Sequence, residues 1–278
     1  MITGATRVAA VIGDPVRHSL SPVLHNAAYR ELGIDWVYAA FEVPDGATKH
    51  ALDAMRTLGL IGLSVTMPHK TAAAAACDEL TPDAEALGSA NTVTPLGDGR
   101  LSGDSTDGPG FLRGLREAGH DVRGATALVL GAGGAARAVA HALGAAGARV
   151  TVCARRDDAA RVAAGLGHGE TVAWDERAAA AAAATVVVNA TPVGMGEGDG
   201  DVPLPVEGLH RGQVVADLVY HPLETALLAG ARERGADVVD GLGMLVHQAA
   251  LQVERWTGDV APVAVMRAAA IGALRPAR

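Results

Sequence analysis

Short apolar runs that end in glycine, proline or polar residues alternate along the chain with stretches of helical periodicity. In the first part of the sequence these runs are Val8 to Ile12, Tyr38 to Val43 and Gly62 to Thr66, and Ala47 to Leu58 has the spacing of an amphipathic helix. Short, nearly continuous apolar runs are typical of strands that are buried on both faces. The alternation therefore predicts an α/β fold with a mostly parallel sheet.

A second series of the same kind begins at Gly124 and continues through a helix that ends at about Ala146. The strands expected in this series are Thr126 to Leu130, Arg149 to Cys153, Thr185 to Ala190, Gln213 to Leu218 and Asp237 to Val239. No strand pattern follows residue 239. The segment from Met244 to Leu274 is therefore expected to form helices that return to the first domain.

The strand that starts at Thr126 runs into a glycine-rich turn, Gly131-Ala-Gly-Gly-Ala-Ala136, and an alanine-rich helix follows. Gly131, Gly133 and Ala136 match the G-x-G-x-x-G/A fingerprint of a dinucleotide site. The three small residues allow a tight turn, close approach of a pyrophosphate, and close packing of helix on strand. Because 35 glycines make chance matches common, the strand before the turn and the helix after it carry this prediction.

The two series predict two domains. Residues 1–107 and 243–278 are expected to form an N-terminal α/β substrate domain, and residues 108–242 a Rossmann-like dinucleotide-binding domain. A site for NAD places Asp or Glu about 20 residues after the glycines. This chain has Ala154-Arg155-Arg156 there, and a guanidinium suits the 2′-phosphate of NADP. NADP is therefore the expected cofactor, and Asp157 and Asp158 are expected to cap the next helix.

Charge and composition narrow the possible partners. A net charge of −8 without basic blocks argues against nucleic acid and against an anionic membrane surface. Cys77 and Cys153 form no CxxC pair, so we expect two incidental buried thiols and no metal site. No segment resembles a targeting signal, and the longest uncharged window, 178–196, contains Asn189 and Pro192. We expect a cytoplasmic protein that acts on a small molecule, as a monomer or homodimer.

Polar residues gather after the strands of the first series. Ser21 before Pro22 has the pattern of a helix N-cap, which would leave the hydroxyl of Ser19 to face a ligand. Lys70 at a helix start is either a surface lysine or a partner for something anionic, because a cation is disfavoured at that helix end. Asp107 is either a helix N-cap or a functional carboxylate. Since ligands bind beyond the carboxyl ends of parallel strands, the convergence of these residues with Asn91 favours a functional interpretation.

Seven motifs, in this order and at these separations, closely resemble the shikimate dehydrogenase family. They are Gly13-Asp-Pro-Val-Arg-His-Ser-Leu-Ser-Pro22, Val65-Thr-Met-Pro-His-Lys70, Ala90-Asn-Thr92, Ser105-Thr-Asp-Gly108, Gly131-Ala-Gly-Gly-Ala-Ala136, Asn189-Ala-Thr191 and Asp240-Gly-Leu-Gly-Met-Leu-Val246. The resemblance covers nearly the whole chain. It implies reversible, NADP-dependent reduction of 3-dehydroshikimate to shikimate, the fourth step of the chorismate route to aromatic amino acids, by an oxidoreductase that acts on a CH–OH group.

The resemblance also implies roles for individual residues. Lys70 and Asp107 would form the catalytic acid–base pair. The substrate-binding residues would be Ser19, Ser21, Thr66, Asn91, Tyr220 and Gln248. The cofactor-binding residues would be Gly131, Gly133, Gly134, Ala135, Arg155, Thr191, Gly241 and Met244.

The chain departs from the family pattern in two places. Ser105 stands where the family usually has Asn before Thr-Asp-Gly, and Ala154-Arg155-Arg156 replaces Asn-Arg-Thr. A dehydrogenase of the same fold that acts on quinate or an aminoshikimate would carry the same acid–base pair, so that alternative stays open. A ligand-sensing regulatory paralogue is disfavoured, because Lys70, Asp107 and the glycine turn are all present and no basic DNA-binding module is.

Overall fold

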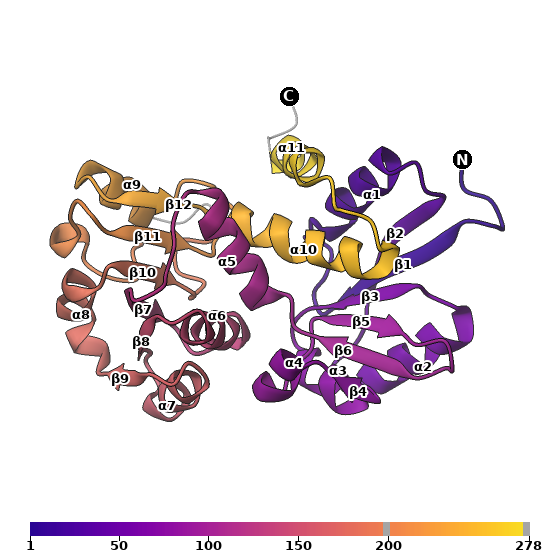
Figure 1. Cartoon of the computed structure of the whole chain (residues 1–278), viewed down its shortest axis with the longest axis horizontal. Coiled ribbons are helices and arrows are strands. Elements are labelled where there is room, and N and C mark those ends of the chain that lie inside the picture. Colours follow the sequence, from indigo (N-terminus) through magenta and orange to yellow (C-terminus); the bar gives the residue numbers. More distant parts are fainter. Residues whose placement is uncertain (197–200, 275–278) are drawn as a thin grey trace. The chain divides into compact units, whose positions relative to one another are not determined.

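The computed structural model describes residues 1–196 and 201–274, so positions 275–278 of the expected first domain and 197–200 of the expected second lie outside the described residues (Figure 1). The chain forms two compact units. Unit 1 consists of Met1–Thr106 together with the C-terminal segment from Gln248, and unit 2 of Asp107–His247. Within the described ranges, no helix combines the length and apolar character needed to span a membrane.

Unit 1 holds a six-stranded sheet in the order β2-β1-β3-β5-β6-β4. Its strands are β1 (Arg7–Gly13), β2 (Trp36–Glu42), β3 (Gly62–Val65), β4 (Glu79–Leu80), β5 (Thr92–Pro95) and β6 (Leu101–Asp104). Its helices are α1 (Ser21–Glu31), α2 (Thr48–Leu58), α3 (Lys70–Ala76), α4 (Pro82–Leu87), α11 (Val263–Leu274) and the part of α10 (Gly241–Thr257) that follows His247. The pairs β1/β2, β1/β3 and β4/β6 are parallel, while β5 pairs antiparallel with β3 and β6.

Alternation along β3 assigns side chains to the two faces of this sheet. Leu63 and Val65 pack with Leu52 and Met55 of α2 in one buried cluster. Ser64, between them, lies on the opposite face, where its hydroxyl bonds to a side chain of α10. The same face needs a glycine at position 62, because a Cβ atom there would overlap the ring of Trp256.

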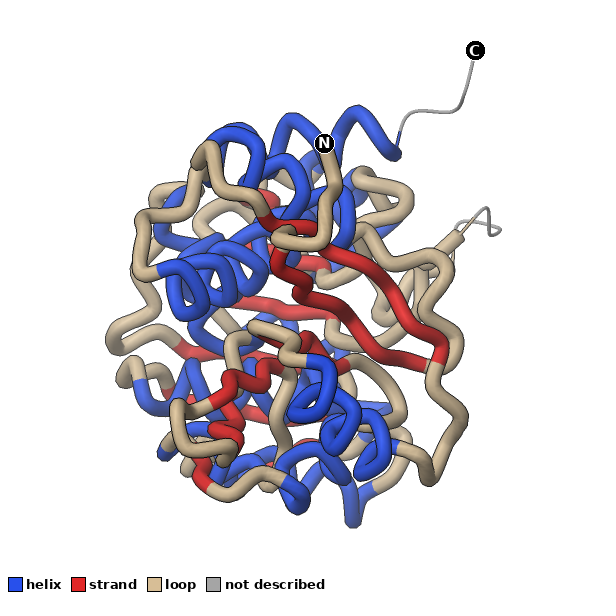
Figure 2. Tube along the Cα trace, turned by 90° about the vertical axis from the view of Figure 1, so that its right-hand side faces the viewer, coloured by secondary structure: helices blue, strands red, loops and turns tan. Residues whose placement is uncertain are grey.

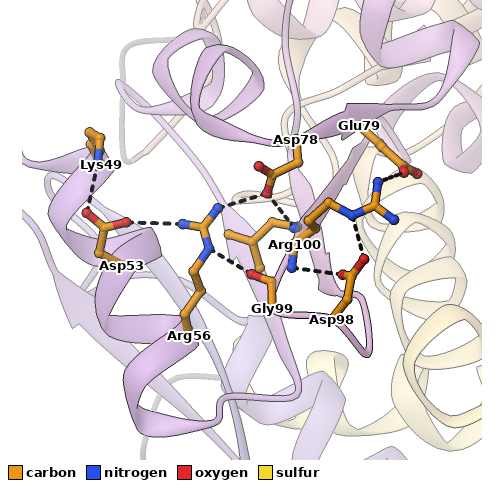
Figure 3. A network of polar contacts seen from close by, with 9 residues as sticks. Lys49, Asp53, Arg56, Asp78, Glu79, Asp98, Gly99 and Arg100 are labelled. Carbon is orange, nitrogen blue, oxygen red and sulfur yellow. Dashed lines mark hydrogen bonds and ion pairs between the residues drawn. The ribbon is translucent and has the colours of Figure 1, made fainter.

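A network of ion pairs on the surface of unit 1 joins α2 to β4 and to the β5–β6 hairpin (Figure 3). Arg56 bonds to Asp53, Asp78 and the carbonyl of Gly99, and Arg100 pairs with Asp98 and Glu79. The Leu101 backbone N–H and the Arg56 guanidinium lower the pKa of Asp78. Because most of these groups are exposed, each ion pair stabilises the fold only weakly.

Unit 2 holds a second six-stranded sheet, in the order β12-β11-β10-β7-β8-β9, and every pairing found among its described residues is parallel. Its strands are β7 (Thr126–Leu130), β8 (Arg149–Cys153), β9 (Glu170–Val172), β10 (Val186–Asn189), β11 (Val214–Asp217) and β12 (Asp237–Val239). Its helices are α5 (Asp107–Glu117), α6 (Gly134–Ala145), α7 (Asp157–Leu166), α8 (Arg177–Ala183), α9 (Ala226–Glu233) and the start of α10, with 3₁₀ turns at Trp174–Glu176 and Val206–Gly208. Figure 2 shows this alternation of helices and strands along the trace.

Both faces of the second sheet are buried, which explains the continuous apolar runs in its strands. Ala127 and Val129 of β7 pack with α5, α6 and α7, whereas Leu128 and Leu130 pack with α8 and α9. The order of the strands and their parallel pairing confirm the predicted Rossmann-like arrangement. The strands β4 and β9 were not predicted, because two or three residues are too short to show a periodic pattern. The helix α9 was not predicted either, because no pattern in the sequence marked where the preceding loop ends and the helix begins.

Two expected helix caps are wrong. Ser21 is the first residue of α1, and Leu20 occupies the N-cap without a side-chain bond. The Ser19 hydroxyl, predicted to be left for a ligand, accepts the Ser21 backbone N–H at 3.2 Å. Asp157 and Asp158 likewise lie in the first turn of α7, where the helix dipole favours carboxylates, but neither caps the helix through its side chain.

Candidate active site

Backbone hydrogen bonds gather three segments of unit 1 around Asn91. Val65 at the end of β3 donates to the carbonyl of Asn91 at 2.8 Å, and Asn91 donates to the carbonyl of Asp104 at 3.0 Å. Ala90 donates to the carbonyl of Lys70 at 3.0 Å. The end of β3, the end of β6 and the start of α3 therefore meet at Asn91, which brings the backbones of Lys70 and Asn91 together.

The side chain of Asn91 is 3% exposed and bonds to its neighbours on β5 and β6. Its Oδ1 accepts the backbone N–H of Thr106 at 2.8 Å and the hydroxyl of Thr92 at 2.9 Å. Its Nδ2 donates to the hydroxyl of Thr106 at 3.0 Å. Because a backbone N–H can only donate, the bond from Thr106 settles which atom of the Asn91 amide is the oxygen.

A buried histidine, His69, holds the segment that leads into Lys70. Its Nε2 lies 2.8 Å from the carbonyl of Val43, and its Nδ1 lies 2.9 Å from the hydroxyl of Thr48. A carbonyl can only accept, so Nε2 carries the hydrogen and Nδ1 accepts from Thr48. With both ring nitrogens bonded, His69 fixes the N-cap of α3, and Lys70 follows as the first, half-buried residue of that helix.

Thr66 lies beside the end of β1. Its backbone N–H donates to the carbonyl of Ile12 at 2.9 Å, and a Cβ atom on Gly13 would overlap the methyl group of Thr66. Gly13 therefore has to be glycine for the two strand ends to pack this closely. Ser19 and Ser21 follow β1 at the same edge of the sheet, half-buried and 8% exposed respectively. The ends of β1 and β3 thus share an edge with Lys70 and Asn91.

The remaining expected residues of this group belong to α5, α10 and the segment after β11. Asp107 is 8% exposed and begins α5, as the first residue of unit 2. Gln248 is half-buried in α10 and is the first residue of the returning part of unit 1. Tyr220, in unit 2, is also half-buried, and burial raises the pKa of its hydroxyl. The neighbouring His247 pairs with Glu117 of α5 at 3.1 Å.

In unit 2 the glycine turn has the conformation that the fingerprint requires. Gly131 has φ +110°, donates its N–H to the carbonyl of Cys153 at 2.8 Å, and leaves no room for a Cβ atom, which would lie 2.9 Å from the carbonyl oxygen of Ala190. Gly133 and Gly134 behave differently, because a Cβ atom on either would meet nothing within 4 Å. The open space before α6 fits a dinucleotide phosphate at the helix N-terminus.

Arg155 and Arg156 follow β8, next to the glycine turn. Both side chains are exposed. Neither guanidinium is paired with a carboxylate within ranges 1–196 and 201–274. Two cations without such partners at this strand end fit the 2′-phosphate that distinguishes NADP from NAD.

A polar cluster that the sequence did not predict anchors the loops after β10 and β11. Asn189 Nδ2 donates to Asp217 Oδ1 at 2.9 Å, and the hydroxyl of Thr225 donates to Asp217 Oδ2 at 2.8 Å. Asn189 Oδ1 accepts the backbone N–H of Thr191 at 3.0 Å and its hydroxyl at 2.7 Å. Burial raises the pKa of Asp217. The cluster positions Thr191, one of the expected cofactor residues, while Gly241 is explained by packing, since a Cβ atom there would overlap the carbonyl of Leu218.

Met244 and Ala135 complete the expected cofactor set. Met244 is half-buried against the cluster that α5, α6 and α7 form on the sheet, and Ala135 is half-buried in the first turn of α6. Sequence reasoning missed Gln252 in unit 1, which is 1% exposed and bonds to Ser64 and Thr92. Its spacing of four residues from Gln248, which places the two amides on one face of a helix, is the signal that could have found it.

Comparison with known proteins agrees with the resemblance that the sequence motifs indicate. The family model described as the shikimate dehydrogenase substrate binding domain matches residues 11–93, and the one described as the shikimate 5′-dehydrogenase C-terminal domain matches residues 241–271. A shikimate dehydrogenase (NADP⁺) of Methanopyrus kandleri is 46% identical, over 99% of this chain and 98% of the relative.

Solved structures share the fold over nearly the whole chain. The shikimate 5-dehydrogenase of Thermus thermophilus, in complex with NADP(H) and shikimate, superposes with a TM-score of 0.89 at 40% identity, over 96% of this chain and 100% of that one. A quinate dehydrogenase of Corynebacterium glutamicum, in complex with NAD, superposes with a TM-score of 0.90 at 32% identity, over 96% of this chain and 99% of that one. With motifs, fold and full-length similarity in agreement, the chain belongs to the shikimate dehydrogenase family.

Proposed function

We propose that this protein is an NADP-dependent shikimate dehydrogenase that reversibly reduces 3-dehydroshikimate to shikimate. The observation that carries the proposal is the arrangement of Lys70, Asn91 and Thr66 at one edge of the unit 1 sheet, in a chain that matches shikimate dehydrogenases over nearly its full length. The place of this reaction in the route to chorismate and the aromatic amino acids belongs to the same proposal.

The substrate is a ring that carries a carboxylate and hydroxyl groups, and the chain offers matching donors. Ser19 and Ser21 supply hydroxyls for the carboxylate. The Asn91 and Gln248 amides and the Thr66 hydroxyl bind the ring hydroxyls, and Tyr220 completes the proposed set. The polar groups that bind Asn91 fix its amide before the substrate arrives, which lowers the entropy that substrate binding costs.

The residues of unit 2 fit NADP. Gly131, Gly133, Gly134 and Ala135 would form the phosphate-binding turn, and Arg155 would bind the 2′-phosphate. Thr191, Gly241 and Met244 would line the remainder of the site. When bound, the reduced cofactor supplies a hydride to the ketone carbon of the substrate.

The proton that completes the reduction comes from Lys70. Hydride addition turns the ketone oxygen into an alkoxide, and the Lys70 ammonium donates one proton to that oxygen to give the hydroxyl of shikimate. The positive charge also stabilises the oxygen while its negative charge develops. Asp107 is the second member of the pair, and it either orients the ammonium, binds a substrate hydroxyl or shares the proton. In the oxidative direction Lys70, as the neutral amine, takes the proton back.

The test is to mix the purified protein with shikimate or quinate, and with NADP or NAD, and to follow reduction of the nicotinamide by absorbance. Shikimate with NADP is expected to give the highest kcat/KM. No turnover with any of the four combinations would rule out the proposed enzyme.

Quinate oxidation is the second candidate, because a quinate dehydrogenase superposes on this chain with a TM-score of 0.90 at 32% identity. That protein is in complex with NAD, whereas this chain presents two arginines where a 2′-phosphate would bind. A higher kcat/KM for quinate than for shikimate would replace the first candidate with the second.

A further inference from the structure

A buried glutamine on α10 bridges two strands of unit 1 beside Asn91. Gln252 Oε1 accepts the hydroxyl of Ser64 at 2.7 Å, and Gln252 Nε2 donates to the hydroxyl oxygen of Thr92 at 2.9 Å. Ser64 and Thr92 are directly opposite each other in the antiparallel pair β3/β5. Their side chains therefore emerge side by side on the same face, and one amide can bond to both.

The bonds around Gln252 run in one direction. The Tyr38 hydroxyl donates to Ser64 at 2.5 Å, so the hydrogen of Ser64 is directed to Gln252. Thr92 accepts from Gln252 and gives its own hydrogen to Asn91 Oδ1 at 2.9 Å. Because Thr92 accepts from the Gln252 amide, its single hydrogen is left for Asn91 Oδ1 at 2.9 Å, which is nearer than its other hydroxyl neighbour, Thr106 at 3.3 Å.

Gln213 shows how a buried glutamine amide can bond without reaching a substrate residue. Gln213 in unit 2 is also 1% exposed. Its Nε2 donates to the carbonyls of Ala181 and Ala184, both at 2.7 Å, and its Oε1 accepts the backbone N–H of His210 at 2.8 Å. The bonds of Gln213 all end on backbone. Gln252 Nε2 also reaches a backbone carbonyl, that of Asn91 at 3.4 Å, but its bond to the Thr92 hydroxyl leads on to the side chain of Asn91.

We propose that Gln252 is a positioning residue for substrate binding, which acts through Thr92 to hold the amide of Asn91 in one orientation. The proposal rests on the proposed function, since it gives Asn91 the role of a shikimate ligand. A carboxylate at position 252 would accept the hydrogen of Thr92 and turn a lone pair of that hydroxyl toward Asn91 Oδ1. Two acceptors would then face each other, which favours rotation of the Asn91 amide.

The test compares Gln252→Glu and Gln252→Leu with Gln213→Glu and Gln213→Leu in the full-length protein. Gln252→Glu is expected to raise the KM for shikimate about tenfold and Gln252→Leu about threefold, while the KM for NADP stays within about twofold of the wild-type value. Both Gln213 variants are expected to lower the thermal midpoint without changing the KM for shikimate. Equal KM values for shikimate in the wild type and in both Gln252 variants would overturn the proposal.

Two variants at Thr92 decide the question if the Gln252 variants do not fold. Thr92→Val removes the hydroxyl at nearly constant shape and is expected to raise the KM for shikimate as Gln252→Glu does. Thr92→Ser keeps the hydroxyl and is expected to keep the wild-type KM. Equal KM values in these two variants would contradict the proposal.

Calorimetric titration of each protein with shikimate separates this proposal from the proposed function. If the wild type binds shikimate without turnover, the proposed reaction fails and the Kd values of the variants still decide the role of Gln252. If the wild type does not bind shikimate, both proposals fail.

Discussion

The carbonyl oxygen of Lys70 accepts the backbone N–H of Ala90 at 3.0 Å, which places the first turn of α3 beside the residue that precedes Asn91. Two motifs that the sequence separates are thus joined by backbone, and their positions do not depend on the side chains that the proposed reaction uses. Substitutions of Lys70 or Asn91 can therefore test chemistry without removing the bond that holds the two segments together.

Replacement of Lys70 by alanine removes the proposed proton donor. Lys70→Ala is expected to lower kcat by roughly 10²- to 10⁴-fold, the usual contribution of general acid–base catalysis, and to leave NADPH binding unchanged. Steady-state kinetics and the fluorescence of bound NADPH measure the two quantities. Lys49→Ala is the matched control, because Lys49 is an exposed lysine of the same unit, paired with Asp53. Wild-type kcat in Lys70→Ala would remove Lys70 from the mechanism.

The two glycines of the phosphate-binding turn are expected to respond differently to alanine. Gly131→Ala should lower the free energy of unfolding by roughly 1 to 3 kcal/mol, because φ is positive and the added Cβ would meet the carbonyl of Ala190. Gly133→Ala should leave stability unchanged, since its Cβ would lie in open space, and should raise the KM for NADP. Urea unfolding measures the stability of both variants, and steady-state kinetics measures their KM for NADP. An unchanged KM in Gly133→Ala would mean that the phosphate lies elsewhere.

Arg155 is expected to provide selectivity for NADP. A charge-assisted hydrogen bond contributes about 1.5 to 3 kcal/mol, so Arg155→Ala should raise the KM for NADP by roughly 10- to 150-fold and leave the KM for NAD nearly unchanged. Arg149→Ala serves as the control, because Arg149 is an exposed residue at the other end of β8. Parallel increases in the two KM values would show that Arg155 does not contact the 2′-phosphate.

His25 is expected to make the stability of the fold depend on pH. It is fully buried, stacks on Tyr38 with ring centroids 4.0 Å apart and lies near Trp256, and burial lowers its pKa from 6.5 to about 4. The unfolded chain therefore binds more protons than the folded chain between those values. Neutral, buried His25 therefore contributes up to about 3 kcal/mol to the free energy of unfolding. This contribution is present above pH 6.5 and is lost as the pH falls toward 4.

Urea unfolding of the wild type and of His25→Gln at several pH values between about 4.5 and 7.5 measures this effect as a difference in slope. Carboxylates with lowered pKa, such as Asp53 and Asp78, titrate in both proteins and cancel in the comparison. Identical slopes would show that folding does not lower the pKa of His25.

Much of the fold follows from local patterns. The apolar runs of β1, β3, β7, β8 and β10 are buried on both faces, so their composition alone indicates interior strands. The turn at Gly131 is equally local in its positive φ, which favours glycine, whereas the close carbonyl of Ala190 comes from a distant segment. The family motifs add Lys70, Asn91 and Thr66, which backbone bonds do bring to one edge. The roles given to these three residues stay predictions, as do those given to Asp107 and Arg155.

Other features were decided only by the tertiary structure. Ser21 was expected to be the N-cap of α1, but it is the first helical residue and its N–H donates to the Ser19 hydroxyl. Which hydroxyl meets an N–H depends on dihedral angles that a sequence pattern does not fix. Gln252 reads as an ordinary helix residue until α10 lies on the sheet and its amide meets Ser64 and Thr92. Periodicity and turn chemistry act between near neighbours and can be read from the sequence, whereas the partners of a buried polar side chain come from distant segments and are set by packing.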